Sequence, residues 1–349
     1  MNKDNLVILS NEKIYDNSGY FCDNIDIKNL SEKLNYHFNV YLIGRKSNQK
    51  RFHKINIKQI KTHASIFSIF FRLKELMINR DSKYLIVSLS PFTFLALILL
   101  KIFNKKVFIY FRSDGFLEYK KIIGILGPII YGFMFYISTK LSLLISCRKN
   151  ILRGKKGYVI LPSQLDASWH QNHKVPSLSK IKLIYVGRIK KEKGIFSLLS
   201  LIKEQSKINL TIVGAGEENT KIISKPNVNV LKIITNKSDL INLYDNNNIT
   251  VLPSYTEGYP MVILESLSRL RPVIVFKDIE HVVENRKGIF VSNRDYSSLN
   301  EKINYIMNNY NSIQESMKLN KLPDNESFIK KLKDILNKKK FEINNGYII

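Results

Sequence analysis

The sequence predicts an α/β protein of two domains, each built on a parallel sheet that helices cover on both faces. Short apolar runs alternate with longer segments of helical periodicity along the chain, which indicates a repeated strand–helix unit. The runs are almost continuously apolar, as in residues 84–89 and 249–252, which is typical of strands buried on both faces. The length of 349 residues is sufficient for two domains of ordinary size.

The first half of the chain supplies the strands and helices of the first predicted domain. Residues 10–24 are polar, include Asn17-Ser18-Gly19, and are predicted as a loop after the first strand. The predicted strands are residues 6–9, 39–43, 84–89, 107–111, 141–146 and 158–161. The predicted helices are residues 26–34 and 92–103.

The second half repeats the pattern. Its predicted strands are residues 182–186, 210–213, 249–252 and 273–276. Its predicted helices begin at residue 195 and cover residues 261–270 and 300–308. Between the two halves, residues 162–179 are polar and lack periodicity, so we place the domain boundary there and predict domains at 1–170 and 171–325.

Two segments of the first half are more apolar than a soluble helix needs. Residues 66–77 have basic residues on both sides, and residues 122–137 carry no charge and contain Pro128. Each is shorter than the roughly 20 residues of a membrane-spanning helix. One interpretation is an interfacial helix at a membrane surface, which the basic surroundings favour; the other is a buried helix of the domain.

The net charge of +26 is distributed unevenly. Residues 1–175 contain 28 Lys/Arg and 11 Asp/Glu, and residues 33–74 contain ten Lys/Arg and no acidic residue. Such a surface attracts polyanions, although a compositional bias toward Lys, Asn and Ile is an alternative source of charge. Because aromatic and basic residues are not interleaved as in a nucleic-acid-binding face, we expect an anionic membrane surface as partner and no nucleic acid.

Metal and redox chemistry have little support in the sequence. Cys22 and Cys147 form no metal or redox motif, and a cysteine-poor chain fits a reducing compartment. His170 and His173 have no third ligand at a suitable spacing, so we predict a linker pair and no metal site. No secretory signal pattern precedes the first strand, and we expect a cytoplasmic protein.

The most informative stretch is residues 251–276, where a strand, a polar loop, a helix and a second strand follow one another. Ligands bind at the carboxyl ends of the strands in such open sheets. Gly258 lets the backbone approach a ligand, and Pro260 needs no amide partner near the helix start. The amides of Met261 and Val262 then form an anion site that the helix dipole reinforces.

Two glutamates belong to the same stretch. Glu257 lies just before the helix, where its charge would repel a phosphate, so it is better suited to accept hydrogen bonds from hydroxyl groups. Glu265 lies inside the helix among apolar residues and is suited to a neutral polyol such as ribose. The alternative is an ordinary first-turn acid and an ordinary surface glutamate.

Arg188 and Lys193 are predicted to point toward the same ligand. Arg188 ends a strand and Lys193 precedes a helix, so two fixed cations can neutralise a diphosphate leaving group. Solvated loop charges are the alternative. Gly214 belongs to a Gly-x-Gly turn after another strand, and this turn alone is a weak fingerprint of dinucleotide binding.

The motif S-x-x-E-G-x-P-x-x-x-x-E at residues 254–265 resembles the donor-site motif of the retaining glycosyltransferases of family 4. The likeness extends over roughly residues 180–310, and Gly-Arg-x4-Lys-Gly at residues 187–194 also fits that family. The resemblance implies the GT-B fold, in which two Rossmann-like domains face each other across a cleft. It also implies that residues 326–349 form a helix that packs back on the first domain.

The resemblance implies a role for each matching residue. Glu257 contacts the transferred sugar and Glu265 the ribose of the nucleotide. Arg188 and Lys193 bind the donor pyrophosphate, and the turn at Gly214 lines the base pocket. The remaining predicted donor contacts are Gly258, Tyr259, Met261 and Val262.

Two departures from the family pattern stand out. Leu270 occupies a place that is usually glycine, two residues before Pro272, which affects the turn between helix and strand. After the strand at residues 107–111, Ser113 replaces a histidine that lies near the donor sugar in the family. Asp114 and Arg112 are the candidates for its role, and a turn with an Asp cap is the alternative.

We therefore expect a retaining, metal-independent glycosyltransferase of the hexosyltransferase type, with a nucleotide-sugar co-substrate and no other cofactor. The acceptor is predicted to be a glycan or lipid-linked sugar of bacterial surface polysaccharide synthesis, used at the inner face of the cytoplasmic membrane. The alternatives are a nucleotide-sugar epimerase or phosphorylase of the same fold, and an inactive scaffold that binds polyanions.

Overall fold

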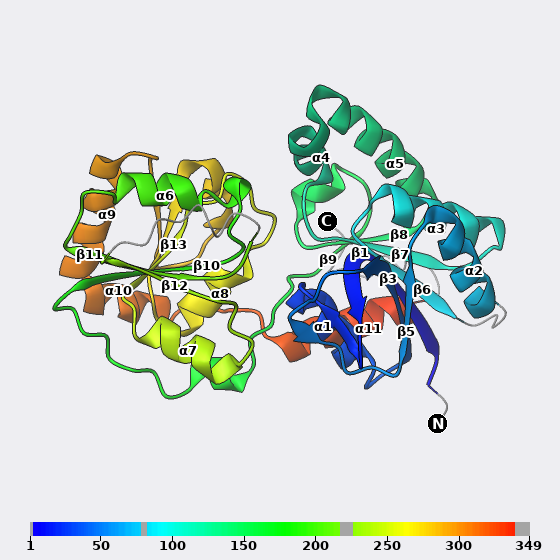
Figure 1. Cartoon of the computed structure of the whole chain (residues 1–349), viewed down its shortest axis with the longest axis horizontal. Helices are drawn as coiled ribbons and strands as arrows, with labels where there is room; N and C mark the ends of the chain where they lie inside the picture. Colours follow the sequence, from blue (N-terminus) through cyan, green and yellow to red (C-terminus); the bar gives the residue numbers. More distant parts are fainter. Residues whose placement is uncertain (1–2, 78–81, 217–225, 339–349) are drawn as a thin grey trace. The chain divides into compact units, whose positions relative to one another are not determined.

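The computed structural model describes residues 3–77, 82–216 and 226–338. The chain divides into two compact units (Figure 1). The first consists of Met1–Gln164 with Asn325–Ile349, and the second is Leu165–Asp324.

The division at Gln164 falls six residues before the predicted boundary at residue 170. Leu165 and Trp169 are buried in a hydrophobic cluster of the second unit, together with Ile184 and Tyr244. Although this stretch is mostly polar, Leu165 and Trp169 pack into the second unit and make the stretch part of it.

The described part of the first unit contains a nine-stranded sheet in the order β4-β2-β1-β6-β7-β8-β9, with β3 paired to β1 and β5 paired to β3. β2 runs antiparallel to β1 and β4, and the other pairs are parallel. The strands are β1 (Asn5–Asp16), β2 (Tyr20–Cys22), β3 (Asn39–Ser47), β4 (His53–Lys54), β5 (Gln59–His63), β6 (Lys83–Val87), β7 (Val107–Phe111), β8 (Leu143–Ser146) and β9 (Tyr158–Val159).

The segment 10–24 differs from its prediction as a loop. β1 continues to Asp16 and forms a hairpin with β2, in which Tyr15 pairs with Phe21. Gly19 lies in the turn of this hairpin with φ of 146°, a conformation that suits glycine. The stretch therefore extends the sheet although its side chains are polar. Strand pairing supplies hydrogen-bond partners for backbone N–H and C=O groups whatever the polarity of the side chains.

The helices of the first unit are α1 (Ile25–Leu34), α2 (Ile66–Met77), α3 (Pro91–Ile102), α4 (Gly115–Ile123), α5 (Gly127–Leu141) and α11 (Asn325–Asn337). The C-terminal helix α11 packs beside α1, and the ring of Phe328 lies 6.1 Å from that of Tyr110 in β7. Lys83 of β6 donates to Asn337 at 2.6 Å. Residues 339–349 of the predicted C-terminal segment lie outside the described residues.

The two strongly apolar segments adopt different arrangements. In α2, Ile69 and Leu73 are buried while Phe67 and Phe71 are exposed, so the helix has one face in the core. The other segment belongs to Gly115–Leu141, the one stretch of described helix that is long and apolar enough to cross a membrane by length and composition. The chain reverses near Gly124, whose φ is 69°, and the stretch forms two helices, α4 and α5, joined by a 3₁₀ turn.

The described part of the second unit contains a six-stranded parallel sheet in the order β12-β11-β10-β13-β14-β15. The strands are β10 (Ile181–Val186), β11 (Ile208–Val213), β12 (Val228–Leu231), β13 (Ile249–Leu252), β14 (Val273–Phe276) and β15 (Ile289–Ser292). The helices are α6 (Ile195–Leu201), α7 (Lys237–Asp245), α8 (Met261–Ser268), α9 (Tyr296–Asn308) and α10 (Tyr310–Met317). β13 and β14 are completely buried, as their apolar sequences predict.

Candidate functional site

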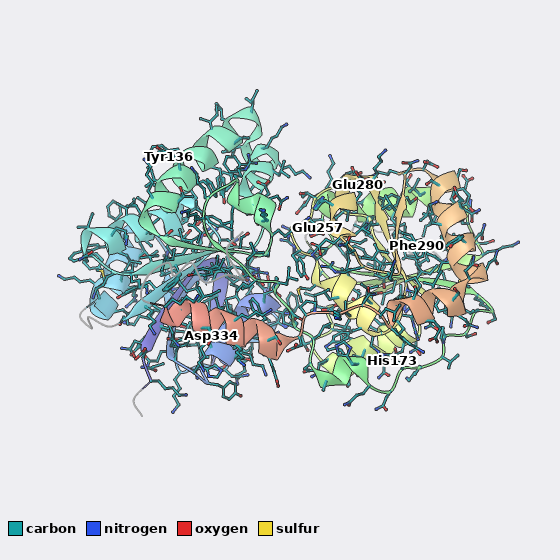
Figure 2. All side chains as sticks on the ribbon, turned by 180° about the vertical axis from the view of Figure 1, so that it is seen from behind. Tyr136, His173, Glu257, Glu280, Phe290 and Asp334 are labelled. Carbon is teal, nitrogen blue, oxygen red and sulfur yellow. The ribbon has the colours of Figure 1, made fainter. Side chains whose placement is uncertain are left out.

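The predicted donor-site residues of the second unit lie at the carboxyl ends of neighbouring parallel strands. β10 pairs with β11 on one side and with β13 on the other. Arg188 follows β10, Gly214 follows β11, and Glu257 lies in the loop after β13. In Figure 2, Glu257 lies on the second unit at a distance from His173, which precedes the first strand of that sheet.

Lys193 and Glu257 form an ion pair. Nζ of Lys193 lies 2.6 Å from Oε1 of Glu257, and the hydroxyl of Ser254 donates to the same oxygen at 2.6 Å. Both charged side chains are largely buried, with 18% and 11% of their surface exposed, and Ser254 is fully buried. Charge-assisted bonds in such a dry setting hold the carboxylate in one orientation.

The loops that carry this pair are also joined through the backbone. The amide of Tyr255 donates to the carbonyl of Glu192 at 3.1 Å. Gly194 has φ of 68°, and a Cβ atom there would stand 1.8 Å from the carbonyl oxygen of Pro253. Glycine is therefore required at position 194 for both its backbone conformation and the space it leaves.

Arg294 also holds the loop after β13 in place. Its guanidinium donates to the carbonyl of Pro253 at 2.9 Å and pairs with Asp278 at 2.6 Å. It also lies 4.0 Å from the ring centroid of Tyr255. Arg294 was not predictable from the sequence, because a single arginine after a strand has no spacing that links it to a loop 40 residues earlier.

Arg188 has an exposed side chain and a fixed backbone. Its carbonyl accepts a hydrogen bond from the buried phenol of Tyr185 at 2.7 Å. The neighbouring turns after β10 and β11 touch, since a Cβ atom on Gly214 would stand 1.9 Å from the carbonyl oxygen of Gly187. Glycine at 214 is thus explained by the close approach of two backbones.

Met261 and Val262 begin α8, which follows the loop containing Gly258 and Tyr259. Pro260 precedes the helix, and within the described residues no side chain caps the first turn. The amides of Met261 and Val262 precede the first intrahelical hydrogen bond, so this terminus suits an anion. The phenol of Tyr259 accepts from Arg286 at 3.0 Å.

Glu265 is buried in the middle of α8, with 8% of its surface exposed. The phenol of Tyr244 donates to its Oε2 atom at 2.8 Å. Burial raises the pKa of Glu265 to about 7, and the hydrogen bond from Tyr244 opposes part of that rise. The alternative of an ordinary surface glutamate is therefore wrong for this position.

The raised pKa predicts that stability depends on pH through Glu265. Between the ordinary value of 4.5 and about 7, the unfolded chain releases the proton that the folded chain keeps. The stability that this group contributes is full below 4.5 and is lost as pH rises through about 7. Glu265→Gln should flatten this decline, by about 3 kcal/mol, in urea unfolding measured between about pH 4.5 and 8.

The control for this measurement is Glu301→Gln, since the Glu301 side chain is 70% exposed. It should leave the pH profile unchanged. A Glu265→Gln profile that runs parallel to the wild-type profile would contradict the assignment of the buried proton to this residue.

Asp114 and Arg112 belong to the first unit and have structural partners there. Asp114 caps α4, accepting from the amides of Phe116 at 2.9 Å and Leu117 at 3.4 Å, so the capping alternative is confirmed. Arg112 forms an ion pair with Asp26. These contacts explain both residues without a ligand, and a catalytic role for Asp114 stays a prediction.

A buried ion network holds the turn between α8 and β14. Arg269 and Arg271 are fully buried, and Arg269 donates to both carboxylate oxygens of Asp245 at 2.9 and 2.7 Å. Their other donors reach backbone carbonyls, including those of Gln171 and Lys174 in the segment before β10. This network was not predictable from the sequence, because buried charged residues of a turn cannot be distinguished there from solvent-exposed ones.

Leu270 lies between these two arginines with φ of 53°. This is the left-handed region that glycine adopts more readily, which explains why a glycine at this position would be less strained. The carbonyl of Leu270 accepts from Gln314 at 2.9 Å. The buried arginines on either side fix the turn, so it forms despite the side chain.

Among the described residues, no group of three or more His, Cys, Asp or Glu is placed to hold a metal ion. His173 bonds the carbonyl of Ser268 at 2.8 Å through its ring, which gives it a structural partner. Cys22 and Cys147 are buried, and the thiol of Cys147 donates to the carbonyl of Arg112 at 3.2 Å.

Comparison with known proteins finds relatives of the second unit. The family model "Glycosyl transferases group 1" matches residues 169–322, which is nearly the whole second unit. The capsular polysaccharide biosynthesis glycosyltransferase CapM of Staphylococcus aureus is 31% identical over 148 residues, which are 38% of this chain and 38% of that protein. The N,N'-diacetylbacillosaminyl-diphospho-undecaprenol alpha-1,3-N-acetylgalactosaminyltransferase of Campylobacter jejuni is 29% identical over 121 residues, or 33% of this chain and 31% of that protein. These matches thus span less than half the length of either relative.

Similarity to solved structures covers both units. The structure of Anabaena Alr3699/HepE in complex with UDP-glucose aligns with 95% of this chain and 99% of its own, with a TM-score of 0.68 and 13% identity. At that identity the likeness shows the fold. Residues 169–322 thus match the glycosyl transferases group 1 family, and the fold of the chain is GT-B.

Proposed function

We propose that this chain is a retaining, metal-independent glycosyltransferase that moves a hexose from a nucleoside diphosphate sugar to a glycan or lipid-linked acceptor. The observation that carries the proposal is the buried Lys193–Glu257 pair at the carboxyl edge of the second sheet, within the segment that matches the family model. The relatives act in capsule assembly and on a diphospho-undecaprenol sugar, by their names, and a structure of the same fold binds UDP-glucose.

The donor diphosphate would lie against Arg188, Lys193 and the start of α8. The Lys193 ammonium has three N–H donors and uses one on Glu257, so it can hold the carboxylate and still donate to a phosphate. The exposed guanidinium of Arg188 can form two parallel bonds to phosphate oxygens. The amides of Met261 and Val262 add the positive end of the helix.

In the reaction, the bond from the anomeric carbon to the diphosphate oxygen breaks and the acceptor oxygen bonds to that carbon. The acceptor proton passes to the departing phosphate, so no protein base is required. Lys193 and Arg188 stabilise the charge on the leaving diphosphate, and Glu257 orients the sugar hydroxyls. Glu265, held by Tyr244, accepts from the ribose hydroxyls.

A lipid-linked acceptor would require the enzyme to work at a membrane. A lipid-linked sugar is reached at the bilayer surface, and the excess positive charge of the first half attracts anionic lipid. We therefore propose that the enzyme acts at the inner face of the cytoplasmic membrane.

The test of the donor site is thermal stabilisation of the purified chain by a panel of UDP-, GDP- and dTDP-sugars and the free nucleotides. We expect selective stabilisation by one donor, since binding at 100 times Kd adds about 2.7 kcal/mol to the unfolding free energy. Lys193→Ala should remove most of this shift, and Lys302→Ala, a surface lysine of the same unit, should retain it. A full shift in Lys193→Ala would contradict the diphosphate assignment.

A further inference from the structure

We propose that the hairpin formed by α4 and α5 inserts its apolar end into one leaflet of a membrane that contains anionic lipid. This inference rests on the proposed lipid-linked acceptor and names the surface of the first unit that would meet the bilayer. In Figure 1 the two helices project together from the sheet of that unit.

The two helices pack as an antiparallel pair. The ring of Phe116 lies 5.5 Å from that of Phe135, and the ring of Tyr119 lies 5.1 Å from that of Tyr131, so residues later in α4 meet residues earlier in α5. Gly127 permits the close approach, because a Cβ atom there would stand 2.1 Å from the carbonyl oxygen of Tyr119. The hairpin is therefore a defined element whose end is the turn at residues 123–127.

The end and one side of this hairpin expose apolar side chains. The turn residue Ile125 is 84% exposed, and Ile122 and Ile129 on either side are 73% and 67% exposed. Further along α5, Phe133 is 64% exposed, while Met134 and Phe135 beside it are buried. The exposed apolar residues of the hairpin are Leu117, Ile122, Ile123, Ile125, Leu126, Ile129, Ile130, Phe133 and Tyr136. Contiguous exposure of this kind marks a surface that meets another apolar phase.

The charge around the hairpin favours an anionic membrane as that phase. Residues 115–160 contain one acidic residue, Glu118, and eight basic ones. The basic residues are Lys120, Lys121, Lys140, Arg148, Lys149, Arg153, Lys155 and Lys156. A second copy of this chain would bring the same positive charge to the interface, whereas anionic headgroups neutralise it.

The length of the apolar surface fits one leaflet. Along α5, Gly127 and Tyr136 are separated by about 14 Å at 1.5 Å per residue, close to half of a hydrocarbon core of about 30 Å. At Tyr136 the composition changes, because Nζ of Lys140 lies 4.2 Å and Nζ of Lys155 lies 5.9 Å from its ring centroid. A tyrosine with two lysines is suited to the level of the lipid headgroups. The apolar residues between the turn and Tyr136 are suited to contact with the acyl chains.

The first experiment measures sedimentation of the full chain with lipid vesicles. We expect binding to phosphatidylcholine vesicles that contain phosphatidylglycerol, and about tenfold weaker binding to phosphatidylcholine alone. The double variant Ile125→Glu, Ile129→Glu should lose binding at least tenfold. The matched control is Val175→Glu, Leu319→Glu, which changes two residues of the second unit that are 93% and 77% exposed.

Two outcomes of this experiment would overturn the proposal. One is full vesicle binding by the hairpin variant. The other is a wild-type chain that is dimeric in solution and becomes monomeric in the hairpin variant without losing vesicle binding, which would assign the surface to a second copy. Donor-induced thermal stabilisation is measured on the same samples, so a failed donor site is distinguished from a failed membrane contact.

The second experiment reports insertion directly. Trp169 is the one tryptophan of the sequence and is buried in the second unit, so a new tryptophan in Ile125→Trp provides the changing fluorescence. We expect a blue shift on vesicles with phosphatidylglycerol and quenching by lipids brominated on their acyl chains. An emission spectrum unchanged by vesicles that bind the protein would overturn insertion of this end.

Discussion

Glu257→Gln is expected to reduce sugar transfer about 100- to 1,000-fold while donor binding changes little. The carboxylate accepts from Lys193 and Ser254, both at 2.6 Å, and is the group proposed to hold the sugar during transfer. Glutamine keeps the shape and one accepting oxygen, so the loop stays in place and the lost charge is isolated as the cause. The measurement is the initial rate of nucleoside diphosphate release with acceptor, beside the dissociation constant of the donor.

Glu280→Gln is the control for this variant. Glu280 is an exposed glutamate of the same unit (Figure 2), and its loss should leave both transfer and donor binding unchanged. Sugar transfer by Glu257→Gln at more than about one tenth of the wild-type rate would contradict the role proposed for Glu257 in transfer.

Asp245→Ala is expected to destabilise the second unit by about 3–5 kcal/mol. Its carboxylate is the partner of Arg269 at 2.7 Å and lies 3.8 Å from Arg271, and both guanidinium groups are fully buried. Without it, two buried positive charges keep only neutral backbone carbonyls as partners. Urea unfolding followed by the fluorescence of Trp169, which packs in the same unit, measures the loss.

The matched control is Glu315→Ala, which removes an exposed pair with Lys318. Exposed pairs contribute at most about 1 kcal/mol, so this variant should unfold near the wild-type midpoint. A loss of less than about 1 kcal/mol in Asp245→Ala would show that the network is not required for the fold.

Strands with continuous apolar sequence were predictable from the chain alone. The runs at Val107–Phe111, Ile249–Leu252 and Val273–Phe276 have the predicted bounds, because burial on both faces favours apolar residues along the whole run. The hairpin of β1 and β2 was not predictable in this way. It includes Glu12, whose carboxylate accepts from the amides of Asp23 and Asn24, so a polar residue is satisfied inside the fold.

The sequence predicted that the site residues follow the ends of strands, but it did not predict which of them are in contact. The chain order placed Lys193 and Glu257 after different strands, and the adjacency of β10 and β13 brings them together across 64 residues. The partners that hold the site were hidden. Tyr244 on α7 and Arg294 after β15 contact the site only because their elements pack beside it. Residue spacing in the sequence does not indicate such packing.

The product formed from the selected donor and a lipid-linked sugar acceptor tests glycosyl transfer directly. We expect the acceptor to gain the mass of one hexose, nucleoside diphosphate to be released in equal amount, and the new linkage to keep the anomeric configuration of the donor. An inverted linkage would contradict retention, and conversion of the donor to another nucleotide sugar without acceptor would identify an epimerase. Unchanged donor and acceptor, with a folded protein, would contradict glycosyl transfer itself.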